Sequence, residues 1–376
     1  MELDEYRASL DAWLEQNLSA LQPDHAGLGS LDDQMEQLAK VKRLTFEAGW
    51  MRWGWPERVG GLGGSILLRG YLGEALTTLD LVEPGLYSMT EVLAPTMIDY
   101  ATPELAADMV PRLLSGAETW CQGFSEPGTG SNLAALTCRA TRDGDVWRVS
   151  GQKVWTSLAQ YAQRCVLLTR TGPPGSAHKG ITALFVDMES PGIEVRPIET
   201  MHGAPEFSEV FFDDVAVPLD RTLGDEGQGW SVAMDLLPFE RSTALWHRAV
   251  HLHVRLQHLL DIAPDDSIDP TDLGEVTQLV YALRARSRST QYRLAAGEKL
   301  GPGTSIDKVL VASAEQAVFD LVADSLGDVL ALGDDPDDTR WRREYLYSRA
   351  ATIYGGTAEI QRNIIARRLL DLGADS

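Results

Sequence analysis

The stretch "WCQGFSEPGTGSNLAALTCRATRDGDVWRVSGQKVWTS", residues 120–157, marks the point at which the chain changes its periodicity. Its second half, from residue 145 to residue 155, alternates apolar and polar side chains, as a strand with one buried face does. Similar strings follow at 164–170, 181–188 and 208–217, separated by turns rich in glycine, proline and serine. The pattern predicts a middle domain of short antiparallel strands, a β-barrel, at residues 119–222.

Helical patterns flank this domain on both sides. The segment "LDDQMEQLAKVKRLTFEAGW" (31–50) carries apolar residues at helical spacing, and helical patterns return after "GDEGQGW" (224–230). Two acidic loops interrupt the second helical region, at 262–275 and 333–339. We therefore expect an α+β fold with an all-helical domain at 1–118, the β domain, and a helical bundle at 223–376.

Composition excludes several classes of protein. The 376 residues are 44% hydrophobic and carry a net charge of -22, which disfavours a nucleic-acid or anionic membrane surface as partner. The first residues, "MELDEYRASLDAWLEQ", are acidic and amphipathic, unlike a signal peptide, and no apolar run is long enough to span a bilayer. Three widely spaced cysteines, Cys121, Cys138 and Cys165, fit a reduced protein. We expect a cytoplasmic location.

The histidines do not predict a metal site. His247 and His251 are one helical turn apart, but Arg248 stands where a zinc protease has its general-base glutamate. His253 and His258 are typical of an ordinary solvated or packed helix face. No metal is therefore expected.

Other common catalytic motifs are missing from the sequence. The run "GFSEP" around Ser125 lacks the second glycine of the hydrolase elbow. The sequence has neither a phosphate loop ending in Gly-Lys-Ser/Thr nor a three-glycine dinucleotide fingerprint after a strand. These absences argue against a Rossmann fold.

A glycine pair precedes the last predicted helix, in "RAATIYGGTAEIQRNIIARRLL" (349–370). Thr357 is a good N-cap, and isoleucines recur behind it at helical spacing. Because Gly355 and Gly356 have no side chains, a ligand could approach the backbone closely at the start of this helix. The alternative interpretation is an ordinary turn or capping glycine pair.

Five motifs in order resemble those of the acyl-CoA dehydrogenase family. The loop at 125–132 and the "W-x-T/S" strand at 155–157 resemble two of them. The other three are "P-x-x-x-G-G" at 56–61, "F-x-x-V-x-V-P" at 212–218, and "G-G-T-x-E-I-Q-R" at 355–362, and the family also shares an "E-R" pair, here at 240–241. The resemblance spans nearly the whole chain and implies a flavin cofactor, FAD.

The resemblance implies which residues contact the flavin. Trp155 offers a flat apolar face and Ser157 offers a hydroxyl for the polar edge of the ring. Ser131 would also reach the pantetheine arm of the substrate. The alternative interpretation of Ser125 and Ser131 is turn chemistry alone. Asn132 stands where the family usually has aspartate. The implied cofactor-binding residues are Gln122, Phe124, Ser125, Gly130, Ser131, Trp155, Thr156, Ser157, Thr357 and Glu359.

The expected catalytic base is missing from its usual place. Many family members carry a glutamate directly before "G-T-x-E", where this chain has Gly355. A minority branch carries it instead on the helix after the β domain, and Glu240 falls on that position, beside Arg241. The resemblance thus implies Glu240 as base, with Ser131, Arg241, Gly355 and Gly356 binding substrate. The alternative is a helix-start glutamate following Pro238.

Two motifs that hold the diphosphate of a neighbour's FAD in the family, "R-x-x-F-G" and "Q-x-x-G-G-x-G", are missing. Acidic tracts at 262–275 and 326–338 replace them and would repel a pyrophosphate. This loss resembles the actinobacterial heteromeric dehydrogenases, many of which act on steroid-CoA side chains. It implies an unlike partner subunit of the same fold in an α2β2 assembly, with a homo-oligomer as the alternative.

The resulting hypothesis is an FAD-dependent dehydrogenase that converts an acyl-CoA to the trans-2-enoyl-CoA and passes electrons to an electron-transfer flavoprotein or similar acceptor. Two alternatives stay open. A flavin-dependent monooxygenase of the same fold would need no carboxylate base. A non-catalytic partner subunit would bind no flavin.

Overall fold

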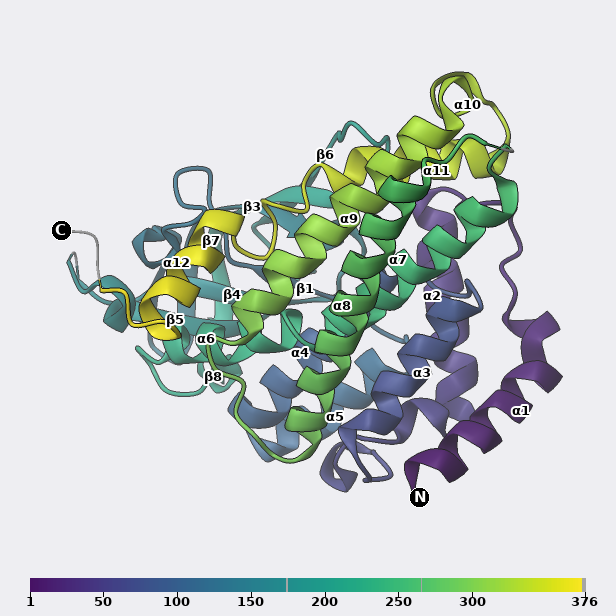
Figure 1. Cartoon of the computed structure of the whole chain (residues 1–376). Helices are drawn as coiled ribbons and strands as arrows, with labels where there is room; N and C mark the ends of the chain where they lie inside the picture. The colour runs from purple at the N-terminus through teal and green to yellow at the C-terminus, as the bar shows by residue number, and fades with distance from the viewer. Residues whose placement is uncertain (174, 265, 374–376) are drawn as a thin grey trace.

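The computed structural model describes residues 1–173, 175–264 and 266–373 of the chain, and its architecture is helix, sheet, helix (Figure 1). The predicted α+β arrangement, with helices on either side of a central β region, is confirmed. The first helices are α1 (Leu3–Leu21), α2 (Leu31–Glu47), α3 (Ile66–Thr78), α4 (Pro84–Tyr100) and α5 (Pro103–Leu114).

The β region forms one sheet with the strand order β6-β7-β3-β2-β4-β5-β8, and β1 pairs with β4 off this path. Most neighbours are antiparallel, as the alternating pattern predicts. β1, however, pairs with β4 in parallel, because the β2–β3 hairpin forms the long crossover that a parallel pair requires. The strands are β1 (Trp120–Gly123), β2 (Arg139–Asp143), β3 (Val146–Ser157), β4 (Arg164–Arg170), β5 (Ile181–Asp187), β6 (Ile193–Ile198), β7 (Phe207–Pro218) and β8 (Thr222–Leu223).

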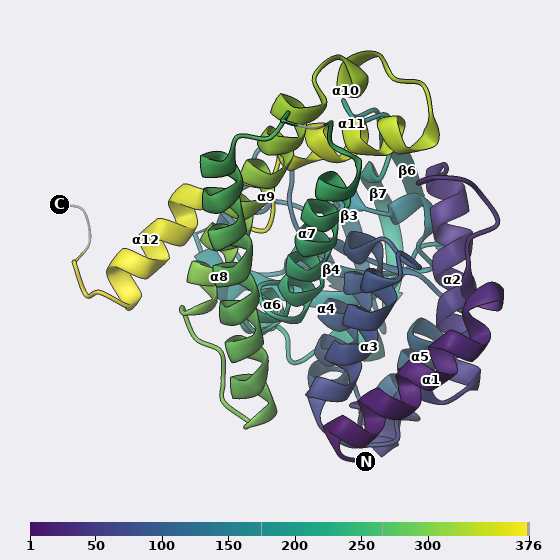
Figure 2. The same cartoon turned by 45° about the vertical axis from the view of Figure 1, so that its right-hand side comes forward.

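The C-terminal helices have a core of their own. Helices α7, α8 and α9 run side by side (Figure 1), and Trp341 of α11 joins their buried cluster. Helix α12 packs against α9, and Figure 2 shows its far end projecting beyond the other helices. These helices are α6 (Gly229–Glu240), α7 (Thr243–Ile262), α8 (Pro270–Ala295), α9 (Thr304–Leu326), α10 (Asp328–Leu332), α11 (Pro336–Ser348) and α12 (Ala358–Arg368).

A second core joins the first helices to the sheet and to α6. Leu68 and Leu93 of the helices share it with Trp120 and Phe185 of the sheet and Leu236 of α6. The position of α6, which ends at the predicted base, is therefore fixed by apolar packing. Within the described ranges, no helix combines the length and the apolar composition needed to cross a bilayer.

The acidic tracts are only partly loops. In the first tract only residues 263–269, of which 265 lies outside the described ranges, connect α7 to α8, so the expectation of a loop through residue 275 is wrong. Asp269 caps α8 by accepting from two backbone N–H groups. The second tract contains the short helix α10, and Asp335 caps α11 in the same way, ahead of Pro336. The expectation of a second acidic loop through residue 339 is wrong, because this cap and a proline at N1 start a helix there.

Candidate active site

The carboxylate of Glu240 lies directly against the backbone of Gly355. Glu240 is the last residue of α6, whereas Gly355 lies just before α12. A Cβ atom built on Gly355 would lie only 2.8 Å from Glu240 Oε1, so a side chain there would compete with the carboxylate for space. Gly355 also has φ of 62°, which side-chain-bearing residues rarely adopt. The two candidate positions for a base glutamate thus converge on one place.

Glu240 does not stand at a helix start. Pro238 lies inside α6, and Arg241 is its C-cap. The helix-start interpretation of Glu240 is therefore wrong. The negative end of the helix dipole disfavours an acidic residue in this last turn by about 0.3–1 kcal/mol. Because the helix dipole disfavours glutamate at this position, the presence of Glu240 indicates a function there.

Polar side chains surround the neighbouring Gly356. It has φ of 89°, and a Cβ atom built on it would lie 2.5 Å from Gln361 Nε2 and 3.3 Å from an Arg241 terminal nitrogen. Gln361 donates to the carbonyls of Gly355 and Gly356, at 3.1 and 3.3 Å. Burial lowers the pKa of Arg241, while Glu240 opposes that shift. Glycine is therefore needed at both positions for two reasons: the backbone conformation is left-handed, and neighbouring side chains occupy the space of a Cβ atom. An ordinary turn accounts only for the first of these reasons.

Lys308 of α9 is a member of this site that the sequence interpretation missed. It is buried, and its Nζ donates to the carbonyl of Ala351 at 2.6 Å and lies 4.3 Å from the ring centroid of Tyr354. Its Cε would lie 3.1 Å from a Cβ atom at Gly355. Burial lowers the pKa of Lys308 to about 8, against the opposing charges of Glu315 and Glu240. Its place on the apolar face of α9, in line with Val311, is the signal that could have found it.

Trp155 is turned outward by an irregularity in β3. The register between β3 and β7 shifts between Lys153 and Thr156, and Trp155 has φ of 58°, which is uncommon for a large side chain. Its indole is 59% exposed and meets the edge of Phe207, with ring centroids 6.1 Å apart. Thr156 is buried, and among the described residues its hydroxyl has no hydrogen-bond partner. The bulge therefore presents a flat apolar face beside an unpaired hydroxyl.

A buried ion pair holds the loop at 123–131 against β3. Lys153 Nζ lies 2.8 Å from Glu126 Oε1 and donates to the carbonyl of Phe124 at 3.1 Å. The Val154 N–H donates to the carbonyl of Ser125 at 3.0 Å. These bonds bring Phe124 and Ser125 beside the Trp155 segment, and their contact with a flavin stays a prediction. The sequence interpretation did not identify the pair, because its partners lie on different segments.

The remaining predicted flavin residues differ in their surroundings. The Oε1 atom of half-buried Gln122 has no hydrogen-bond partner among the described residues. Gly130 and Ser131 are exposed at the open end of the loop. Thr357 caps α12 by accepting from the Ile360 N–H, as predicted, and Glu359 is exposed. None of the contacts that we find for Thr357 and Glu359 within the described ranges reaches the Trp155 segment.

A pocket lies beside the end of β3, between the first helices and α11. Ser157 lines it at one end, and Arg248 and Tyr347 line it at the other. The rings of Tyr347 and Tyr354 are 5.9 Å apart, and Tyr354 directly precedes Gly355. The pocket thus lies between Ser157 and the tyrosines that precede the glycine pair, although neither Trp155 nor Glu240 lines it. A wider hollow beside α2 contains none of the predicted residues.

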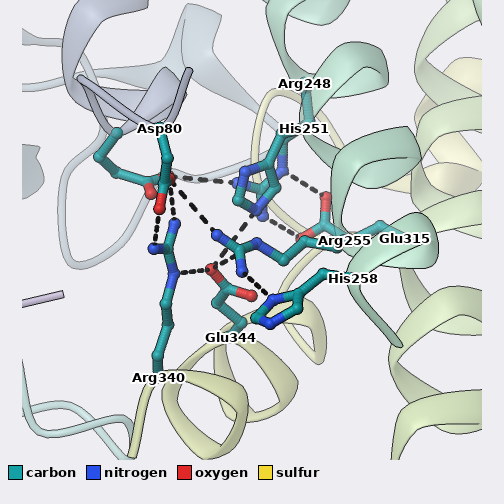
Figure 3. Close-up of polar contacts among 9 residues, drawn as sticks. Asp80, Arg248, His251, Arg255, His258, Glu315, Arg340 and Glu344 are labelled. Atoms are coloured by element: carbon teal, nitrogen blue, oxygen red, sulfur yellow. Dashed lines mark hydrogen bonds and ion pairs between the residues drawn. The ribbon is translucent and has the colours of Figure 1, made fainter. Parts of the chain in front are cut away.

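A group of ligand-type residues lies near the pocket but is poorly suited to a metal. Glu83, His251 and Glu344 bring their ligand atoms within 4.8 Å of one another. Arg340 Nε lies 3.0 Å from Glu344 Oε1 (Figure 3), and Arg248 Nη1 lies 3.6 Å from Glu83 Oε1. Burial and the nearby arginines hold the pKa of His251 well below its usual value. Because guanidinium groups already neutralise these carboxylates, a further cation would be repelled.

The chain is similar to known proteins along its whole length. Three family models match in order: the N-terminal domain of acyl-CoA dehydrogenase at residues 2–117, its middle domain at 121–215, and its C-terminal domain at 227–370. The acyl-CoA dehydrogenase IpdE1 of Mycobacterium tuberculosis is 36% identical over 382 residues, which cover 99% of this chain and 98% of that protein.

Two solved structures extend the comparison. The Tcur3481-Tcur3483 steroid ACAD is 25% identical with a TM-score of 0.83, covering 99% of this chain and 97% of that one. The ChsE4-ChsE5 complex from Mycobacterium tuberculosis is 27% identical with a TM-score of 0.79 and full coverage of both chains. The predicted likeness to the actinobacterial steroid-CoA type is confirmed by these similarities.

The family models and the similar proteins define an oxidoreductase that acts on acyl-CoA thioesters. The chain belongs to the acyl-CoA dehydrogenase family, whose members are flavoproteins. The resemblance stated from the motifs is therefore confirmed. The roles of the individual site residues stay predictions.

Replacing Trp155 by alanine should weaken flavin binding about tenfold, the effect of losing an aromatic contact of roughly 1.4 kcal/mol. The fold should survive, because the indole is exposed and contributes little to the core. Flavin content and absorption spectrum after gel filtration measure the effect. Tyr281→Ala removes a similarly exposed ring from α8 and serves as the control. Unchanged flavin content in Trp155→Ala would show that this side chain does not cover the ring.

Replacing Lys308 by methionine should change how stability depends on pH. Between pH 8 and 10.5 the unfolded chain holds a proton that folded Lys308 has released, so the parent gains stability as pH rises. Relative to Lys308→Met, this gain should reach about 3 kcal/mol in the free energy of unfolding. Urea unfolding at about pH 7 and pH 10 measures it, with exposed Lys299→Met as the control. A parent-to-variant difference independent of pH would contradict this prediction.

Proposed function

We propose that this protein is an FAD-dependent acyl-CoA dehydrogenase in which Glu240 removes the α-proton of the acyl thioester, yielding a trans-2-enoyl-CoA. The observation that carries the proposal is the position of the Glu240 carboxylate, 2.8 Å from the point where a side chain at Gly355 would begin. Position 355 is where many family members carry their base. Glu240 places its carboxylate at the same point from a different helix, so it can accept the same α-proton of the substrate.

The residues present fit a flavin ring. The exposed face of Trp155 would cover the ring, and the unpaired Thr156 hydroxyl and Gln122 Oε1 offer hydrogen-bonding atoms for its polar edges. When bound, FAD supplies the acceptor for the hydride that leaves the β-carbon of the substrate. The loop that carries Phe124 and Ser125 would close one edge of the ring site and help to exclude water.

The glycine pair and its neighbours would hold the thioester. With no side chains at Gly355 and Gly356, the thioester could lie against the backbone, and the Gly355 N–H could donate to its carbonyl oxygen. Arg241 adds a positive charge beside Gly356, where negative charge develops on that oxygen as the α-proton leaves. Gln361 would keep the two glycine carbonyls oriented away from the substrate.

The assembly that we propose contains an unlike subunit of the same fold. Two features support it: the acidic residues where the family binds a neighbour's cofactor tail, and the similarity to the ChsE4-ChsE5 complex. The exposed leucines Leu369, Leu370 and Leu372, at and beyond the end of α12, offer apolar surface to a partner. A steroid-derived acyl-CoA as substrate, an electron-transfer flavoprotein as acceptor and a cytoplasmic location complete the proposal.

Glu240→Gln should bind flavin and substrate but lose flavin reduction about 100-fold or more, since glutamine cannot accept the proton. Stopped-flow bleaching of the flavin by substrate measures the rate, and the flavin spectrum verifies that the cofactor is retained. Glu226→Gln, at an exposed position shortly before α6, is the matched control and should behave as the parent does. Equal bleaching by Glu240→Gln and the parent would remove Glu240 from the mechanism.

Native mass spectrometry with flavin quantitation should find an α2β2 assembly with fewer flavins than subunits when the chain is produced with its partner. The acidic tracts would repel a cofactor diphosphate, so two copies of this chain should not complete two FAD sites. Produced alone, the chain should hold FAD weakly. A homodimer or homotetramer with one tightly bound FAD per subunit would contradict the proposed assembly and leave the role of Glu240 untouched.

A further inference from the structure

The pocket that runs from Ser157 to Tyr347 is lined by an unusual share of ionisable side chains. Ligand pockets for hydrocarbon chains are lined mainly by apolar residues. This one has Leu86 and Met89 on its wall but also six acidic, basic or histidine residues. These are Glu83, His202, Glu206, Arg248, Arg343 and Glu344.

Some of these groups are already neutralised by partners in the protein. Arg248 forms two short hydrogen bonds with Glu315, at 2.5 and 2.9 Å, and faces Glu83. Glu344 Oε1 faces Arg340, with the Nε of Arg255 at 3.5 Å. Their charges are therefore balanced within the wall, and an ionic group on a ligand is not required to compensate them.

Other polar atoms of the lining have no partner. Within the described ranges, the Nε2 atom of His202, the Nε of Arg343 and the Oε2 of Glu344 are buried without a hydrogen bond. Glu344 as a whole is more than nine-tenths buried. Leaving such atoms unsatisfied costs stability, so each is a place where a ligand oxygen or hydroxyl would be favoured.

The pocket also favours neutral ligand groups over charged ones. Burial raises the pKa of Glu206 to about 7 and lowers that of His202 to about 4, so both sites disfavour charge. Burial likewise raises the pKa of Glu83. A carboxylate entering here would meet Glu206 and Glu344 as well as Arg343. A keto oxygen could accept from the N–H groups of Arg343 and His202, and a hydroxyl could in addition donate to Glu344 Oε2.

We propose that this pocket receives the part of the acyl group remote from the thioester and selects acyl groups that carry hydroxyl or keto oxygens there over plain hydrocarbons of the same size. The inference rests on the proposed function and specifies its substrate class. A plain hydrocarbon would leave the Nε2 of His202 and the Oε2 of Glu344 unpaired and dehydrated. Sites built for hydrogen bonding reject such analogues strongly, so we expect a preference of about 10- to 100-fold.

The test compares three synthetic thioesters with the same ring: cyclohexanepropanoyl-CoA and its 4-oxo and 4-carboxy derivatives. Each has the α- and β-hydrogens that desaturation needs, so only the remote group differs. Specificity constants are measured on the flavin-loaded enzyme, with its partner subunit if one is required. Thioester affinities are measured separately by calorimetry on Glu240→Gln, which separates binding from chemistry.

The expected result is a 4-oxo to unsubstituted ratio of at least about tenfold in both rate and affinity. His202→Phe keeps a ring against Tyr347, whose centroid is 5.4 Å away, but removes Nε2, so this ratio should fall. Arg343→Met should lower the ratio as well. His178→Phe, at an exposed histidine beside Trp230 and outside the pocket, is the matched control and should leave the ratio unchanged.

Three outcomes would overturn the inference: a ratio near one in the parent, a ratio unmoved by both pocket variants, or a preference for the 4-carboxy thioester. If the proposed function itself is wrong, the experiment gives a different result. In that case no thioester bleaches the flavin, even though calorimetry on Glu240→Gln still reports the preference for the 4-oxo compound.

Discussion

One buried guanidinium, that of Arg248, joins the helices that build this site. It bonds to Glu315 of α9 through two nitrogens, faces Glu83 at the start of α4, and lies over the ring of Tyr347 on α11. Glu315 also accepts from the hydroxyl of Tyr354, directly before the glycine pair. Removing one member of such a buried pair would leave an uncompensated charge, at a cost of about 3–5 kcal/mol. The relative positions of α4, α7, α9 and α11 therefore depend on this contact.

The polar network continues from Arg248 along α7 (Figure 3). Arg255 and Arg340 both pair with Asp80, in the connection between α3 and α4, and both face Glu344. Burying these charges costs desolvation energy, so the network contributes little net stability compared with an apolar interface. It fixes one geometry between the first and last helices, and it leaves charged and polar atoms lining the pocket between them. The same residues thus position the site and give it its polarity.

Local features of the site follow from the sequence, whereas contacts between distant segments do not. Thr357 caps the last helix as its type and place predict, and the alternating strings become strands. Lys308 and Gln361 were missed because their roles depend on a backbone that the chain brings to them from elsewhere. The parallel pairing of β1 with β4 is likewise set by tertiary arrangement and not by any local pattern.

The glycine pair explains why Glu240 can take the place of a residue at 355. Two carboxylates at this point would overlap, and even a methyl group on Gly355 would come within 2.8 Å of Glu240 Oε1. Because Gly355 and Gly356 both adopt left-handed conformations, a side chain there would also strain the backbone. Glycine at position 355 thus leaves the space that the Glu240 carboxylate occupies. The missing glutamate at 355 and the glutamate that ends α6 against its helix dipole fit one constraint, because the space at this point holds a single carboxylate.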